Sequence, residues 1–123
     1  MAQDIKQKIV LEGEKEYNAA IKEAQRNLKT LKSELKAETA ELGKNATAQQ
    51  KAEVKAKSLQ KQIAEQEKIV KANKAALEEA RKEYGDNAEV VAKWEQKLNE
   101  SRATLANMKN SINRLRFTSP GDF

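Results

Sequence analysis

Apolar side chains recur at alternating intervals of three and four residues along almost the whole chain. With Ile21 taken as position a of a heptad, thirteen of fourteen a positions are apolar as far as Ile112, and nine of fifteen d positions are apolar between Tyr17 and Leu115. This alternation places the side chains on one stripe of an α-helix, and burying that stripe requires a partner helix. The other positions are mostly Lys, Glu, Gln, Asn and Ala, which favour or tolerate an exposed helix. The pattern predicts an all-α fold of long coiled-coil helices.

The large apolar residues of the two columns form the predicted helix–helix seam. They are Tyr17, Ile21, Leu28, Leu31, Leu35, Leu42, Leu59, Ile63, Val70, Leu77, Tyr84, Val91, Trp94, Leu98, Leu105, Met108, Ile112 and Leu115. Polar residues interrupt the d column at Gln66, Asn73 and Asn87. Such residues weaken a seam, and a buried Asn can fix the register or oligomeric state of a coiled coil.

Glycines and capping sequences divide this pattern into three helices. Gly13 precedes an acidic first turn, and Gly43 and Gly85 stand where a glycine ends a helix. A Thr-x-x-Gln sequence at 47–50 and an Asp-x-x-Glu sequence at 86–89 resemble capping boxes, which begin helices.

These signals set the expected organisation of the chain. We expect helices over 14–42, 46–84 and 87–116, within one helical region that covers 14–116. Residues 1–13 are expected to form a short extended segment, and residues 117–123 an irregular tail that contains Ser119-Pro120-Gly121.

Two architectures are compatible with these helices. The turn signals favour a three-helix antiparallel hairpin stack. The heptad phase favours a continuous helix, because it is the same before and after the weak helical segments at 43–49 and 85–87. Two independent turns would preserve the phase by chance about once in fifty, taking roughly one in seven for each. We therefore favour a nearly continuous rod of roughly 150 Å over residues 17–115, with the hairpin stack as the alternative. A rod would require a partner, because its stripe would otherwise face water.

Composition excludes several classes of chemistry. The sequence has neither Cys nor His, which rules out disulfides, Ser-His-Asp and Cys-His nucleophilic sites and zinc sites built on those residues. Glu34, Glu38 and Glu41 share a helix face, where we favour local pairing with Lys over metal binding. We predict no catalytic, cofactor-binding or metal-binding residues, no small-molecule substrate and no enzymatic activity.

The longest apolar run, at 9–11, is too short for a membrane span or a signal peptide. We therefore expect no membrane contact.

The net charge of +5 arises from 24 basic and 19 acidic residues. A candidate basic face on the middle helix consists of Lys57, Lys61, Lys68, Lys71 and Lys82. Lysines at regular spacing can follow phosphates. No aromatic residue lies among them to stack on bases, so a solvated helix face is the favoured interpretation and nucleic acid the less favoured partner.

The first third of the chain resembles the start of tail tape measure proteins from phages that infect Gram-positive bacteria. In that family a short apolar segment and a glycine precede a Tyr-containing amphipathic helix and then a long Lys/Glu/Ala/Gln-rich coiled coil. The matching residues here lie within 5–38: Ile9, Val10, Leu11, Gly13, Tyr17, Ile21, Leu28, Leu31 and Leu35. The resemblance implies a helical rod inside the tail tube, whose length sets the length of the tube. The expected location is therefore a virion tail or the host cytoplasm. Members of the family are much longer than this chain.

The leading hypothesis is a structural coiled-coil protein that acts in phage tail assembly and tail length through association with itself or with other helical tail proteins. The alternative is a small phage-encoded helical binding module that inhibits or adapts a host protein or nucleoprotein, for example as an anti-defence protein. A bacterial coiled-coil scaffold unconnected with phage is the third reading.

Overall fold

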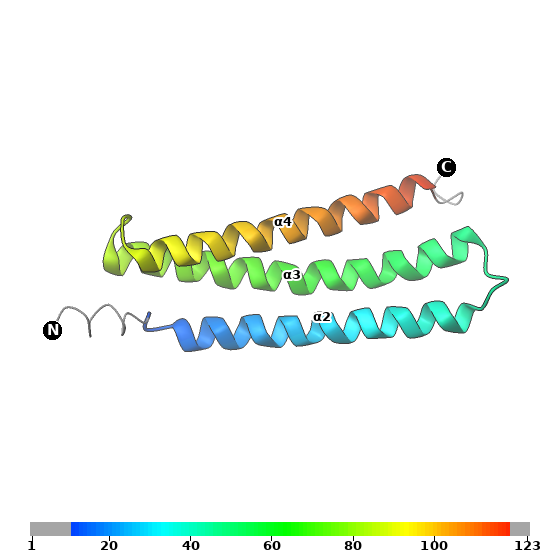
Figure 1. The fold of residues 1–123 in the computed structure, drawn as a ribbon, viewed down its shortest axis with the longest axis horizontal. Helices are drawn as coiled ribbons and strands as arrows, with labels where there is room; N and C mark the ends of the chain where they lie inside the picture. The colour runs from blue at the N-terminus through cyan, green and yellow to red at the C-terminus, as the bar shows by residue number, and fades with distance from the viewer. Residues whose placement is uncertain (1–10, 119–123) are drawn as a thin grey trace.

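A computed structural model describes residues 11–118, with side chains described as far as Leu115. Three helices account for nearly all of these residues: α2 (Glu14–Leu42), α3 (Ala48–Tyr84) and α4 (Glu89–Thr118). They lie side by side with alternating direction, and α3 runs between the other two (Figure 1). The predicted all-α fold is confirmed, in the form of the antiparallel hairpin stack.

The preference for a continuous rod was wrong, because the chain reverses at both glycines. Gly43 has φ 79° and ψ −179°, and Gly85 has φ 82° and ψ 163°. This backbone region is open essentially to glycine alone, and it turns the chain out of the helix. The N–H of Gly43 still donates to the Ala40 carbonyl at 3.1 Å, and that of Gly85 to the Arg81 carbonyl at 3.0 Å. The continuous heptad phase is compatible with reversal, because a helix that follows a turn can face its stripe inward at any phase.

The capping box at 47–50 forms as predicted. The Gln50 N–H donates to Thr47 Oγ1 at 3.0 Å, and the Thr47 N–H donates to Gln50 Oε1 at 2.8 Å. These two bonds satisfy N–H groups that a helix start otherwise leaves without partners. Thr47 is therefore the N-cap, and α3 begins at Ala48 rather than at residue 46.

The bounds of α4 differ from the expected 87–116 by two residues at each end. The helix begins at Glu89, and the Asp86 carboxylate lies 3.6 Å from Arg81 Nε across the turn. At the other end the helix continues to Thr118, so the first two residues of the predicted irregular tail are helical.

Most of the predicted extended segment, residues 1–10, lies outside the described residues. Within the part of the chain that the structure describes, Glu12 and Gly13 form a turn that leads into α2, and the Glu14 N–H donates to the Leu11 carbonyl at 3.0 Å. Leu11 itself is 1% exposed and belongs to the core. The turn therefore places an apolar side chain in the core near the α3–α4 turn.

The core consists of two clusters along α3. The larger lies near the α3–α4 turn and contains Leu11, Ala76, Leu77, Ala80, Val90, Val91 and Trp94. The second, further along the bundle, contains Ala24, Leu28, Ile69 and Met108. Backbone contacts join α3 closely to both α2 and α4, whereas α2 and α4 approach each other much less. Small side chains at Ala72, Ala76 and Ala80 allow this close approach, because they recur every four residues on one helix face.

Among the described residues, no helix is long and apolar enough to cross a membrane.

Candidate interaction surface

The predicted seam is covered unevenly. Its buried members are Leu28, Leu59, Leu77, Val91, Trp94, Met108 and Ile112. Its half-buried members are Tyr17, Ile21, Leu31, Leu35, Leu42, Ile63, Val70, Leu98, Leu105 and Leu115. Tyr84 is 40% exposed at the end of α3, because the chain turns away at the next residue. Intramolecular packing therefore covers only part of the apolar stripe.

The middle helix carries a second buried face that the a and d columns miss. It includes Ser58, Gln62, Ile69, Ala72 and Ala76, none of which occupies an a or d position. A helix packed on two sides needs two inward faces. Small and polar side chains give little hydropathy signal, although alanines four residues apart were visible in the sequence.

Polar side chains link α3 to α4 in the middle of the bundle. Gln66 Nε2 donates to the Ser101 carbonyl at 3.0 Å, and Asn73 Nδ2 donates to the Lys97 carbonyl at 3.2 Å and to Ser101 Oγ at 3.1 Å. Ser101 Oγ in turn donates to the Leu98 carbonyl at 2.9 Å. These bonds explain how Gln66 and Asn73, two of the polar residues of the d column, are accommodated inside. They fix one relative position of the two helices, since any shift would leave buried polar groups unpaired.

The largest buried side chain, Trp94, joins the three helices at the end of the bundle near the α3–α4 turn, which we call the closed end. Its ring meets the ring of Tyr17 edge-on, with centroids 6.3 Å apart. Lys97 Nζ lies 4.4 Å from the centroid of the same ring. Burial, followed by the charge of Lys93, lowers the pKa of Lys97. This arrangement is a packing site, in which Lys97 of α4 lies over the indole ring.

A carboxylate on α3 holds the start of α2. Oε1 of Glu79 accepts a hydrogen bond from the Tyr17 hydroxyl at 2.7 Å, and its Oε2 accepts one from the Gly13 N–H at 3.3 Å. The hydrogen bond to Glu79, together with burial, raises the pKa of Tyr17 to about 12.

The candidate basic face is exposed but interleaved with carboxylates. Lys68 pairs with Glu65 at 2.9 Å, and the Asn27 amide donates to the same carboxylate at 2.8 Å. These two hydrogen bonds, Asn27 first, lower the pKa of Glu65. Lys68 also shares a groove with Glu23 of α2.

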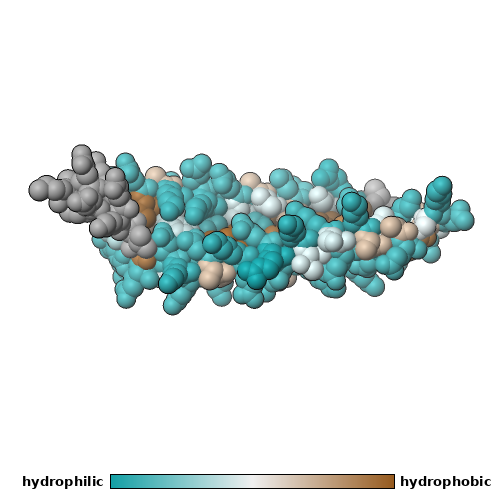
Figure 2. Space-filling view, turned by 60° about the horizontal axis from the view of Figure 1, so that its bottom comes forward, coloured by the Kyte–Doolittle hydropathy of each residue, from teal (hydrophilic) through white to brown (hydrophobic). Residues whose placement is uncertain are grey.

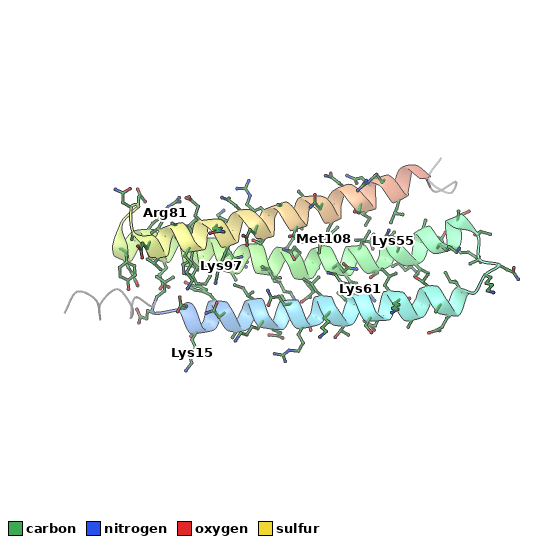
Figure 3. All side chains as sticks on the ribbon, in the orientation of Figure 1. Lys15, Lys55, Lys61, Arg81, Lys97 and Met108 are labelled. Atoms are coloured by element: carbon green, nitrogen blue, oxygen red, sulfur yellow. The ribbon has the colours of Figure 1, made fainter. Side chains whose placement is uncertain are left out.

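Lys61 lines a second α2/α3 groove together with Glu34, and it lies on the side of α3 toward α2 (Figure 3). Acidic groups of α2 therefore flank the lysine stripe on which a phosphate backbone would have to lie.

A different groove, between α3 and α4, has only cations among its charged residues. We call it the α3/α4 groove; it has a volume of about 530 Å³ and is lined by Val70, Lys74, Leu98, Arg102, Leu105, Ala106 and Lys109. Its apolar members include three half-buried residues of the predicted seam.

On the face drawn in Figure 2, apolar surface appears only as a broken line between hydrophilic side chains. A partner helix could therefore cover the remaining apolar surface only by binding in grooves such as the α3/α4 groove.

The described residues contain no group of three or more His, Cys, Asp or Glu side chains placed to hold a metal ion. Glu34, Glu38 and Glu41 are each exposed on α2.

The comparisons with known proteins add no relative to this picture. No protein-family model matches the chain, and no curated protein or solved structure is significantly similar to it.

Proposed function

We propose that this chain is a structural protein that acts through helix–helix association and serves in a phage tail. The observation that carries the first part is the incomplete covering of the seam. Val70, Leu98 and Leu105 are half-buried in an open groove although they occupy a positions of an otherwise regular heptad pattern. Covering such residues with another helix is favourable, at about 25 cal/mol per Å² of apolar surface removed from water.

The phage tail enters the proposal through the resemblance of residues 5–38 to tape measure proteins. In the hairpin stack the longest helix has 37 residues and a length of roughly 55 Å, much shorter than the extended chain. A length-setting role would need the chain to straighten at Gly43 and Gly85. The unbroken heptad phase supports this step, because the same stripe would remain on one side of the straightened helix.

The experiment uses tails purified from the phage or prophage whose genome carries the sequence. Mass spectrometry should find peptides of this chain in the tails. An in-frame deletion of one heptad, residues 64–70, should then shorten the tail by about 10 Å if the chain lies extended in the tube. Tails that lack the chain would overturn the proposal. Tails that contain it but keep their length would restrict it to a structural role without measurement.

A binding module for a host protein is the second candidate, and the self-contained closed end favours it. Trp94 and Leu11 are fully covered within one chain, as a small folded inhibitor requires. This candidate predicts a chain that is present in the cytoplasm of infected cells and missing from purified virions, so fractionation of one infected culture separates the two.

A further inference from the structure

The α3/α4 groove combines an apolar floor with a rim of one charge sign. Val70, Leu98 and Leu105 supply half-buried apolar surface, and Arg102 and Lys109 are exposed beside them. Leu98 and Leu105 are seven residues apart, as are Arg102 and Lys109. The α4 wall of the groove therefore repeats with the heptad that a helical partner would follow.

The end of α2 has the complementary pattern. Leu35 and Leu42 are half-buried and seven residues apart, and Glu34 and Glu41 are exposed and also seven residues apart. From residue 31 to residue 42 the helix rises roughly 16 Å, which equals the rise of α4 from residue 98 to residue 109. Length and heptad spacing therefore match between the two segments, and their exposed charges at 34, 41, 102 and 109 are of opposite sign.

We propose that a second copy of this chain occupies the α3/α4 groove with the end of its α2 helix, residues 31–42. Glu34 and Glu41 of one copy face Arg102 and Lys109 of the other, while the leucines of both meet between the charges. Each copy has one groove and one α2 end, so two copies related by a two-fold axis satisfy both contacts and close the assembly. This inference rests on the proposed function, because it names the partner of the helix–helix association.

Charge reversal tests the contact. Two variants are made, Arg102→Glu with Lys109→Glu, and Glu34→Lys with Glu41→Lys; all four side chains are exposed, which keeps the fold intact. Sedimentation equilibrium should give a dimer for the wild-type chain. Each variant alone should dissociate with a Kd at least about tenfold higher, because like charges then face each other. An equimolar mixture of the two variants should recover the dimer, because both contacts of the mixed pair are again between opposite charges.

The matched control is Lys57→Glu with Lys71→Glu, which makes the same charge change as the groove variant on α3 residues that do not line the α3/α4 groove. It should leave the Kd unchanged, and circular dichroism should show equal helicity for all variants. A wild-type chain that is monomeric up to about 1 mM, the weakest range of specific association, would overturn the inference. A dimer that neither charge variant weakens would also overturn it, since another face would then make the contact.

Neither result bears on whether the chain is found in purified tails. Failure of the groove contact and failure of the proposed function are therefore separately visible.

Discussion

The hydroxyl of Tyr17 donates a 2.7 Å hydrogen bond to Oε1 of Glu79, a residue 62 positions later in the sequence. The other oxygen of the same carboxylate accepts the backbone N–H of Gly13. A single side chain of α3 thus fixes both the last turn before α2 and the first turn of that helix. Because Tyr17 also packs against Trp94 of α4, this contact connects all three helices.

Replacing Tyr17 by Phe should remove the hydrogen bond and lower the free energy of unfolding by about 1 kcal/mol at neutral pH. The effect should depend on pH, because the pKa of Tyr17 is raised to about 12 from its ordinary value of 10.0. The folded chain then holds this proton more tightly than the unfolded chain. The contribution is complete below pH 10 and is lost as the pH rises toward 12.

Urea unfolding of wild type and the Tyr17→Phe variant at several pH values between 8 and 12 measures this difference. The gap between the two proteins should narrow above pH 10. A gap that stays constant to pH 12 would contradict the contact with Glu79.

Gly43→Ala and Gly85→Ala should each destabilise the chain by about 1–3 kcal/mol, because an L-residue is strained at these backbone angles. An added methyl group would meet no atom within 4 Å at either position, so the cost is one of backbone conformation alone. The sign is informative. In a continuous rod the same substitutions would stabilise the helix by about 1 kcal/mol each, and thermal unfolding distinguishes the two signs.

Thr47→Ala should cost about 1 kcal/mol, because it removes the side-chain half of the capping box of α3. Thr30→Ala is the matched control, since Thr30 is exposed within α2 and alanine is the better helix former there. The control should be neutral or slightly stabilising in the same unfolding assay. Equal losses for the two variants would mean that the cap contributes nothing.

Trp94→Ala should cost about 3–5 kcal/mol, because it leaves a large cavity where α2, α3 and α4 meet. Trp94→Phe should cost less, since the smaller ring still fills much of the site. The wild-type emission provides an independent check: Trp94 is the only Trp in the sequence and is 0% exposed, so its fluorescence should be blue-shifted and should move to the red on unfolding. Emission typical of an indole in water would contradict the packing at the closed end.

The helices themselves were predictable because their ends have local causes. Glycines that adopt positive φ, and a threonine with a glutamine three residues later, act within one turn of the chain. Sequence reasoning therefore placed both ends of α2 and the end of α3 correctly. The start of α4 was placed two residues early, because Asp86 faces Arg81 instead of beginning a helix.

The direction of the chain at Gly43 and Gly85 was not predictable from the heptad phase. A helix that follows a turn can face its apolar stripe toward its neighbour at any heptad phase, so a continuous phase does not exclude a hairpin stack. The second face of α3 was missed for another reason. Ala72 and Ala76 contribute by being small, which allows a neighbouring helix to approach closely. Hydropathy periodicity detects large apolar side chains and does not detect this. The contact between Tyr17 and Glu79 has no local signal at all, because it depends on how the helices pair.

The position of α3 between the other helices has a consequence for synthesis. Of the three helices, α2 leaves the ribosome first, whereas α3 and α4, which later cover it, are encoded downstream. An isolated helix of its length is only marginally stable in water. The leucines of α2 therefore stay in the solvent until the residues that cover them have emerged; for Leu28 these include Ile69 of α3 and Met108 of α4. During that interval they are open to chaperones, or to a neighbouring nascent copy on the same messenger RNA.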